Sequence, residues 1–229
     1  MREIIFDTET TGLKTEEGHR VTELGCVEVI NMIPTGREFH TLINPERDVP
    51  PDATAITGHT WELLKDQPLF ADVAEKFLEF VGDSVLVAHN APFDRGFINM
   101  ELSRAGYPEI PASRFKDTAA MARERFPGSP ANLDALCKRF EISLESRTKH
   151  GALIDAYLLA EVYLELNGGR TRALDFAGDG GAGGKVSFPA RPPRPQPLGP
   201  LSKPDERARH AAFLASFGGE EAWKPYTTD

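Results

Sequence analysis

The stretch IIFDTETTGL (residues 4–13) places two acidic side chains one residue apart in a segment that otherwise has the apolar pattern of a buried strand. Because side chains alternate between the two faces of a strand, Asp7 and Glu9 share one face with Ile5. Two neighbouring carboxylates repel each other and resist burial. From this stretch alone two interpretations stay open: a strand end that emerges into solvent, or a pair of ligands for a cation.

The chain around this stretch has the pattern of an α/β domain. Runs of apolar and β-branched residues predict strands, and apolar residues three and four apart predict helices. The sequence PTG at 34–36 favours a hairpin turn, and Asn90 is expected to cap a helix. The expected strands are 3–8, 22–30, 36–43 and 84–89, and the expected helices are 68–82, 90–106, 118–126, 132–140 and 151–167.

Asp94 and Asp155 are two further acids in expected helices. Asp94 lies in a first helical turn after an apolar strand, where it either stabilises the helix dipole or acts as a ligand. Asp155 lies on an apolar stripe with Leu159, so a cation or several hydrogen bonds must offset its burial. His150 would be about 140° away around the same helix, so it is expected on the preceding loop. There it either leans over the site of Asp155 or is an ordinary surface histidine.

Four separated acids and one histidine suit two-metal phosphoryl chemistry. Oxygen-rich ligand sets select Mg²⁺ or Mn²⁺ over zinc. Two such ions about 3.5–4 Å apart activate a water and stabilise the leaving oxygen of an in-line displacement. Histidine has an ordinary pKa of about 6.5, which suits the base that takes the proton of that water.

Three motifs in order, FDTETTGL, HNAPFD and HGALIDA, resemble those of the DEDD exonuclease superfamily in its histidine-containing DEDDh branch. The resemblance covers residues 1 to about 170. It implies an RNase H-like α/β fold, a mixed sheet with three antiparallel strands first and helices on its flanks. It also implies His150 as the general base and Asp7 as the bridge between two Mg²⁺ or Mn²⁺ ions. The implied metal ligands are Asp7, Glu9, Asp94 and Asp155.

The same resemblance extends to substrate contacts, which would include Asp7 and Glu9 themselves. Thr10 and Leu13, which follow the first motif, would lie near the terminal nucleotide. Asp52 and Thr57 would occupy further substrate-contacting positions in DATAITGHT. This chain departs from its relatives there, because they often carry histidine-glycine where it has Thr57-Gly58.

The composition changes after Arg170. Residues 178–184 include five glycines and residues 189–200 include six prolines, so 171–201 is expected to be a flexible, then semi-stiff linker. Residues 202–229 form the expected tail, which begins with a short helix. In that helix Ser202 and Asp205 form a capping box, and Phe213, Leu214 and Phe217 share one side.

Within the branch, HGALIDAYLLAEVYLELNGG most resembles the epsilon proofreading subunits of bacterial DNA polymerase III. In that family a segment after the nuclease domain holds the polymerase alpha subunit, which here would be residues 171–229. The resemblance implies a frayed DNA 3′ end as substrate and a theta-like subunit as a further partner. Residues 196–201, QPLGPL, vaguely resemble a peptide that binds the sliding clamp.

The bulk composition is that of a cytoplasmic protein without a membrane span or signal sequence. Two cysteines give no disulfide framework. A net charge of −9 argues against direct binding to duplex DNA unless cations intervene, although residues 185–210 carry six Lys and Arg against two acids. Beside a proofreading 3′–5′ exonuclease, two alternatives stay open: a related RNA-trimming exonuclease, and an interaction subunit that stabilises a polymerase.

Overall fold

The computed structural model describes residues 1–144, 151–169 and 204–216. The chain divides into two compact units, Met1–Asp175 and Phe176–Asp229, which are taken separately. The expected linker 171–201 lies outside the described residues. The division into 1–170, 171–201 and 202–229 therefore stays a prediction.

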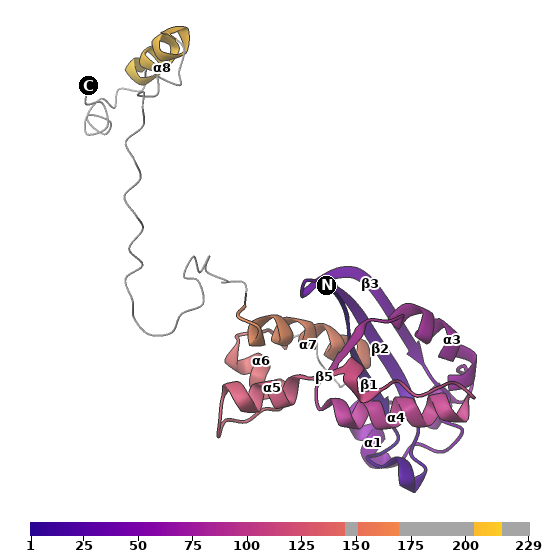
Figure 1. Ribbon diagram of the computed structural model, residues 1–229. Coiled ribbons are helices and arrows are strands. Elements are labelled where there is room, and N and C mark those ends of the chain that lie inside the picture. Colours follow the sequence, from indigo (N-terminus) through magenta and orange to yellow (C-terminus); the bar gives the residue numbers. More distant parts are fainter. Residues whose placement is uncertain (145–150, 170–203, 217–229) are drawn as a thin grey trace. The chain divides into compact units, whose positions relative to one another are not determined.

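The first unit is built on a five-stranded mixed sheet with the order β3-β2-β1-β4-β5 (Figure 1). β1, β2 and β3 are antiparallel neighbours, and β4 and β5 run parallel to β1. The expected RNase H-like sheet with three antiparallel strands first is thereby confirmed. The strands are β1 (Arg2–Thr10), β2 (Val21–Ile30), β3 (Ile33–Leu42), β4 (Val85–Ala88) and β5 (Phe115–Asp117).

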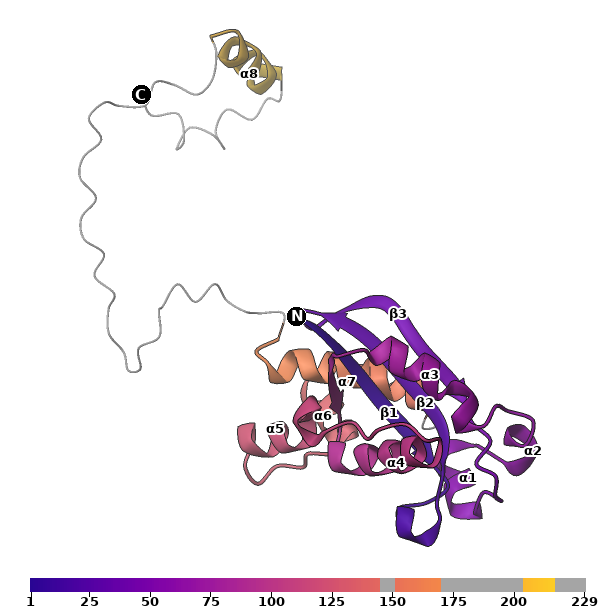
Figure 2. The same ribbon diagram turned by 45° about the vertical axis from the view of Figure 1, so that its right-hand side comes forward.

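Helices cover both faces of the sheet (Figures 1 and 2). α3 and α4 pack on the face that carries Ile4 and Phe6. α7 covers the opposite face, which carries Ile5 and Val27, and α5 and α6 pack against α7. These helices are α3 (Phe70–Val81), α4 (Ala91–Arg104), α5 (Thr118–Arg125), α6 (Leu133–Arg139) and α7 (Ala152–Leu166).

The hairpin between β2 and β3 turns earlier than the sequence suggested. The turn lies at Asn31 and Met32, whose φ angles are 52° and 67°, and residues 34–36 already belong to β3. Two-residue hairpin loops favour two left-handed residues, and Asn tolerates this conformation well. Gly36, with φ 84°, instead lies where the register of β3 against β2 is irregular. The expected turn at PTG was wrong because its glycine serves a bulge.

Several short elements were not expected from the sequence. They carry too few residues for a periodic pattern, and α1 starts within a Pro-Pro pair that reads as loop. Asn90 lies at the N-cap position of α4 but has a left-handed φ of 69°, and its side chain forms no capping hydrogen bond. The unexpected elements are α1 (Pro51–Thr57), α2 (Trp61–Leu64), β5 and the 3₁₀ turns η1 (Thr15–Glu17) and η2 (Ala112–Arg114).

The second unit contributes one described helix, α8 (Pro204–Ser216). An ion pair of 3.0 Å joins Arg209 to Asp205 one turn earlier, and Phe213 is 57% exposed. The expected helix is thus present, although Ser202 and Phe217 lie outside the described residues. Within the described parts of the chain, no helix combines the length and the apolar character needed to span a membrane.

Candidate active site

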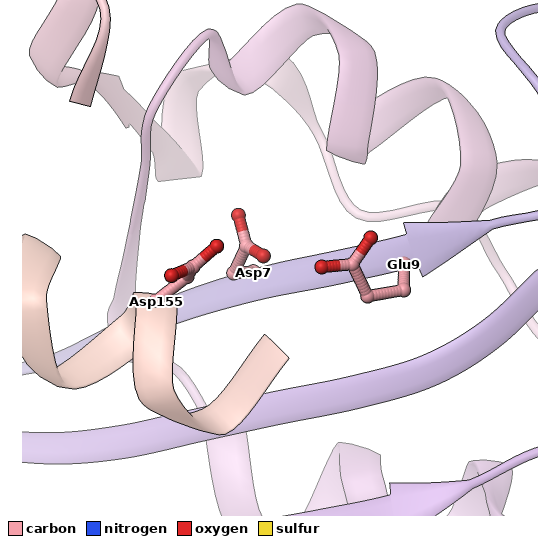
Figure 3. A group of neighbouring side chains, drawn as sticks. All are labelled: Asp7, Glu9 and Asp155. Carbon is pink, nitrogen blue, oxygen red and sulfur yellow. The ribbon is translucent and has the colours of Figure 1, made fainter. Parts of the chain in front are cut away.

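Asp7, Glu9 and Asp155 meet at one point between β1 and α7. Ligand oxygens of the three side chains all lie within 4.8 Å of one another. Figure 3 shows Asp7 and Glu9 on β1 beside Asp155 on α7. Asp7 and Glu9 point to the α7 face because they follow Ile5 at the two-residue period of the strand. Asp155 lies in the first turn of α7, so its side chain comes down onto β1.

Asp94 approaches from α4, across the edge of β1. β4 pairs with β1 only as far as Ile5, so the β1 edge beyond that residue is open to another partner. The Oδ1 atom of Asp94 takes this place, because it accepts hydrogen bonds from the Thr8 amide at 3.1 Å and the Thr8 hydroxyl at 2.8 Å. A cavity of about 220 Å³ is lined by Asp94 together with Asp7, Glu9 and Asp155.

The environment of Asp94 favours a bound cation or a proton. Its side chain is 2% exposed. Burial raises the pKa of Asp94 to about 7, although the hydrogen bonds from Thr8 act in the opposite direction. A divalent cation in the cavity would restore the charged form, since an opposite charge nearby favours ionisation. An all-carboxylate donor set fits Mg²⁺ or Mn²⁺.

His150, the expected general base, lies outside the described residues. α7 begins at Ala152, two residues after it, with Gly151 at the N-cap position. The expectation that His150 lies on the loop before the helix of Asp155 therefore stays a prediction. The position of the imidazole relative to the four acids stays a prediction.

Five of the six expected substrate-contacting residues, all except Asp7, line a neighbouring cavity of about 620 Å³. Thr8, Glu9 and Phe93 line both cavities, so the two adjoin. The larger one has apolar side chains open to solvent, with Leu13 79% and Ile56 54% exposed. The residues that meet there from the first motif and from α1 are Thr10, Leu13, Asp52 and Thr57.

The hydroxyl of Thr57 already has two partners in the fold. It donates to the Ala53 carbonyl at 3.0 Å and accepts the His59 amide at 3.0 Å. Thr57 therefore closes the end of α1. Its side chain gives shape to the cavity wall.

Sequence reasoning missed several residues that line the two cavities. Thr8, His89 and Phe93 stand inside the first two motifs, so a closer reading of those motifs would have found them. Lys14 and His19 belong to the β1–β2 connection and line the larger cavity without any local signal. The walls of the two cavities therefore include residues that lie outside the three motifs.

His89 borders the acidic cavity. Its Nδ1 lies 3.0 Å from the hydroxyl of Thr118, which also donates to the Ala88 carbonyl at 3.1 Å. Burial lowers the pKa of His89, although a hydrogen bond to the Ala131 backbone acts in the opposite direction.

Comparison with known proteins places this site in a family. Residues 4–163 match the family model described as exonuclease. The DNA polymerase III subunit epsilon of Rickettsia felis is 56% identical over 177 residues, which are 76% of this chain and 77% of the relative. The subunit of the same name from Escherichia coli K12 is 45% identical over 187 residues, 78% of this chain and 76% of the relative.

Solved structures agree with the sequence matches. Exonuclease X in complex with 5′-overhanging duplex DNA is 30% identical, with a TM-score of 0.57 over 72% of this chain and 89% of that one. The nuclease domain of 3′hExo, a DEDDh family member bound to rAMP, shares the fold at 18% identity, with a TM-score of 0.60 over 73% and 92%. The chain therefore belongs to the exonuclease family and, within it, to the epsilon subunits of DNA polymerase III, which are proofreading 3′–5′ exonucleases.

Proposed function

We propose that the chain hydrolyses the terminal phosphodiester bond of a mispaired DNA 3′ end and releases nucleoside 5′-monophosphates. The convergence of four acids from β1, α4 and α7 on one 220 Å³ cavity carries this proposal. The adjoining 620 Å³ cavity has the size and the exposed apolar surface for a terminal nucleotide. The relatives named as DNA polymerase III subunits support DNA over RNA as the substrate.

Asp7, Glu9, Asp94 and Asp155 are the residues that would hold two Mg²⁺ or Mn²⁺ ions. Members of the family use divalent metal ions, and the carboxylate cluster fits this chemistry. When bound, two such ions supply an activated water and stabilise the leaving oxygen. An imidazole nitrogen of His150 accepts the proton of the attacking water.

The residues of the larger cavity orient the 3′ end for this attack. Leu13 and Ile56 offer apolar surface to the terminal base. Thr10 donates its hydroxyl proton to the Gly12 carbonyl at 2.7 Å, which fixes the turn after β1 at the cavity wall. Asp52 and Thr57 form the opposite wall on α1. The terminal nucleotide is thereby held next to the acids.

The decisive experiment is digestion of a 5′-labelled, 3′-mismatched oligonucleotide, run on DNA and RNA in parallel. Asp7→Ala should reduce turnover to background, and a chelator should do the same until Mn²⁺ is added. His150→Ala should lower turnover by about 10²–10⁴-fold, the usual contribution of a general base. Asp83→Ala changes an exposed carboxylate elsewhere and serves as the control. Digestion by Asp7→Ala at the control rate would contradict the metal assignment.

The tail is the proposed attachment to the polymerase alpha subunit, through residues 171–229. Its described helix exposes Phe213, and a short isolated helix with an exposed aromatic residue gains stability from a partner. A theta-like subunit and, through residues 196–201, the sliding clamp are further proposed partners. The same attachment would also support the second candidate function, that of a subunit that stabilises a polymerase.

Deletion of residues 171–229 tests the attachment. The shortened protein should digest the labelled oligonucleotide at the full-length rate but no longer co-purify with alpha. Retained co-purification would reject the tether. If instead the full chain stabilised alpha without digesting either nucleic acid, the interaction function alone would stand.

A further inference from the structure

Glu23 is a buried carboxylate that lies outside both cavities. It stands opposite Glu9 in the antiparallel pairing of β1 with β2, so the two side chains share the α7 face of the sheet. It is 5% exposed. None of the three motifs includes it, and it lines neither of the cavities described above.

Three groups from separate parts of the chain, β3, the α1–α2 connection and α7, hold the Glu23 carboxylate. His40 on β3 donates from Nε2 to Oε1 at 2.7 Å, and Nε2 of His59 lies 3.3 Å from Oε2. The backbone amide of Ala152, the first residue of α7, is the third donor. Burial alone would raise the pKa of Glu23, but the hydrogen bonds from these three donors lower it to about 2. The carboxylate is therefore charged, and both of its oxygens have partners within the fold.

Two of these partners, His59 and Ala152, lie next to residues that line the two cavities. The His59 amide donates to the Thr57 hydroxyl at 3.0 Å, so His59 is fixed to the wall of the larger, 620 Å³ cavity, called the nucleotide cavity from here on. Ala152 lies three residues before Asp155, in the same first turn of α7. Glu23 thus joins the end of α1 to the start of the helix that carries a proposed metal ligand.

Gly25 fixes the same turn of α7 from the neighbouring position on β2. It pairs with Asp7, as Glu23 pairs with Glu9. A Cβ atom at Gly25 would lie 2.3 Å from the Ala152 carbonyl carbon and equally close to the Leu153 nitrogen. The backbone of α7 can reach the sheet only because this side chain is missing. β2 therefore determines where α7 begins, directly behind the two acids of β1.

We propose that Glu23 is a positioning residue that couples the nucleotide cavity to the metal site, by holding the end of α1 and the first turn of α7 on one carboxylate. The inference rests on the proposed site at Asp7, Glu9, Asp94 and Asp155. Loss of the Glu23 charge weakens the hydrogen bonds of Ala152 and His59 together, while the Thr22 hydroxyl, 3.1 Å from Nδ1 of His59, and the close packing at Gly25 remain. The first turn of α7 around Asp155 and the cavity wall at Thr57 are then no longer held on one carboxylate.

The test uses the full chain and three variants, Glu23→Gln, His59→Asn and the double variant. Glu28→Gln is the matched control, because Glu28 is also a buried glutamate of β2 (3% exposed) but pairs with Arg2 and Arg37. The measurements are kcat and KM on the labelled DNA at saturating Mn²⁺, Mn²⁺ affinity, and hydrogen exchange of the amides of residues 152–155. The exchange measurement requires no activity, so it separates this proposal from the proposed function.

Glu23→Gln should lower kcat by about tenfold or more, the range for outer partners of metal sites, and speed exchange at residues 152–155. His59→Asn should mainly raise KM, and the double variant should lose less than the two single effects combined, since both break one connection. Glu28→Gln should change neither kcat nor the exchange of α7. If Glu23→Gln fails to fold, His59→Asn tests the proposal instead, through its KM and through the hydrogen exchange of residues 152–155.

Equal kcat and equal α7 exchange in Glu23→Gln and Glu28→Gln would overturn the proposal. Additive effects of Glu23→Gln and His59→Asn would overturn the coupling. If Asp7→Ala remains active while the exchange results are as expected, the metal assignment fails and the connection through Glu23 stands as a purely structural one.

Discussion

Asp94 and Glu101 are two buried carboxylates on α4, about two turns apart, and their surroundings differ. Glu101 is 1% exposed and accepts two hydrogen bonds from the Arg20 guanidinium, at 2.7 and 2.8 Å, and one from the Val21 amide at 3.2 Å. Asp94 is 2% exposed and, within the described residues, forms no ion pair. The Arg20 guanidinium balances the charge of Glu101, whereas a charged Asp94 would need a bound cation as its countercharge.

The difference shows how one helix serves both stability and chemistry. The Arg20–Glu101 pair ties the start of β2 to α4, and its two parallel hydrogen bonds offset the cost of removing both charges from water. At the other end of α4, burial raises the pKa of Asp94 to about 7. A buried acid indicates a binding site where the protein supplies no countercharge, and a structural role where it supplies one.

Asp94→Asn should have the largest effect on activity. Asn keeps the shape of the side chain and can accept the Thr8 hydrogen bonds, but it removes the charge that would hold a metal ion. Turnover on the labelled DNA should fall by more than about a hundredfold, the upper end for loss of an outer partner of a metal site. Thermal unfolding of the variant should show an intact fold. Normal turnover would remove Asp94 from the site.

Glu101→Ala should have the opposite effect: it should lower the free energy of unfolding and leave turnover nearly unchanged. Among the described residues it leaves the 7%-exposed Arg20 with the half-exposed Glu46 as its ion-pair partner, at 2.9 Å. Removal of one member of a buried ion pair costs about 3–5 kcal/mol in the free energy of unfolding, and the remaining partner places the expected loss at the lower end. Urea unfolding measures this loss. Turnover per folded molecule should stay within a few-fold of the unmodified protein; a large loss would mean that the pair also shapes the site.

The pH dependence of stability tests the same difference through the protonation of Asp94. The pKa of Asp94 is about 7 in the folded protein and 3.8 ordinarily, so between these pH values the folded state binds the extra proton. The free energy of unfolding of the metal-free protein should therefore fall as pH rises from about 4 to 7. Asp94→Asn should reduce this slope and Mn²⁺ should offset it, both measured by urea unfolding in chelator. An unchanged slope in Asp94→Asn would assign the pH dependence to other groups.

Local sequence patterns were enough to predict most of the helices and strands. The strands at 3–8 and 22–30 and the helices at 68–82, 90–106 and 151–167 were expected within a few residues, because each is long enough to show its period. The acids could be found for a related reason: Asp7, Glu9 and Asp155 interrupt apolar patterns, and a buried charge stands out in such a pattern. His150 was expected instead from its place just before the helix of Asp155 and from the family resemblance, and it lies outside the described residues.

The features that escaped the sequence depend on residues far apart in the chain. β5 has three residues and is a strand only because Leu86 and its neighbours in β4 are beside it. Gly25 reads as a weak position in a strand until α7 lies on it, and Glu23 reads as an ordinary polar residue until His40, His59 and Ala152 surround it.

The sequence by itself determined the element types, the two faces of β1 and the identity of the acids, since these follow from periods of two and 3.6 residues. Only the tertiary structure decided that β4 ends early enough for Asp94 to bind the open edge of β1. It also decided that β2 fixes the start of α7 opposite Asp7 and Glu9. Contacts of this kind join residues separated by many positions, so no local period records them.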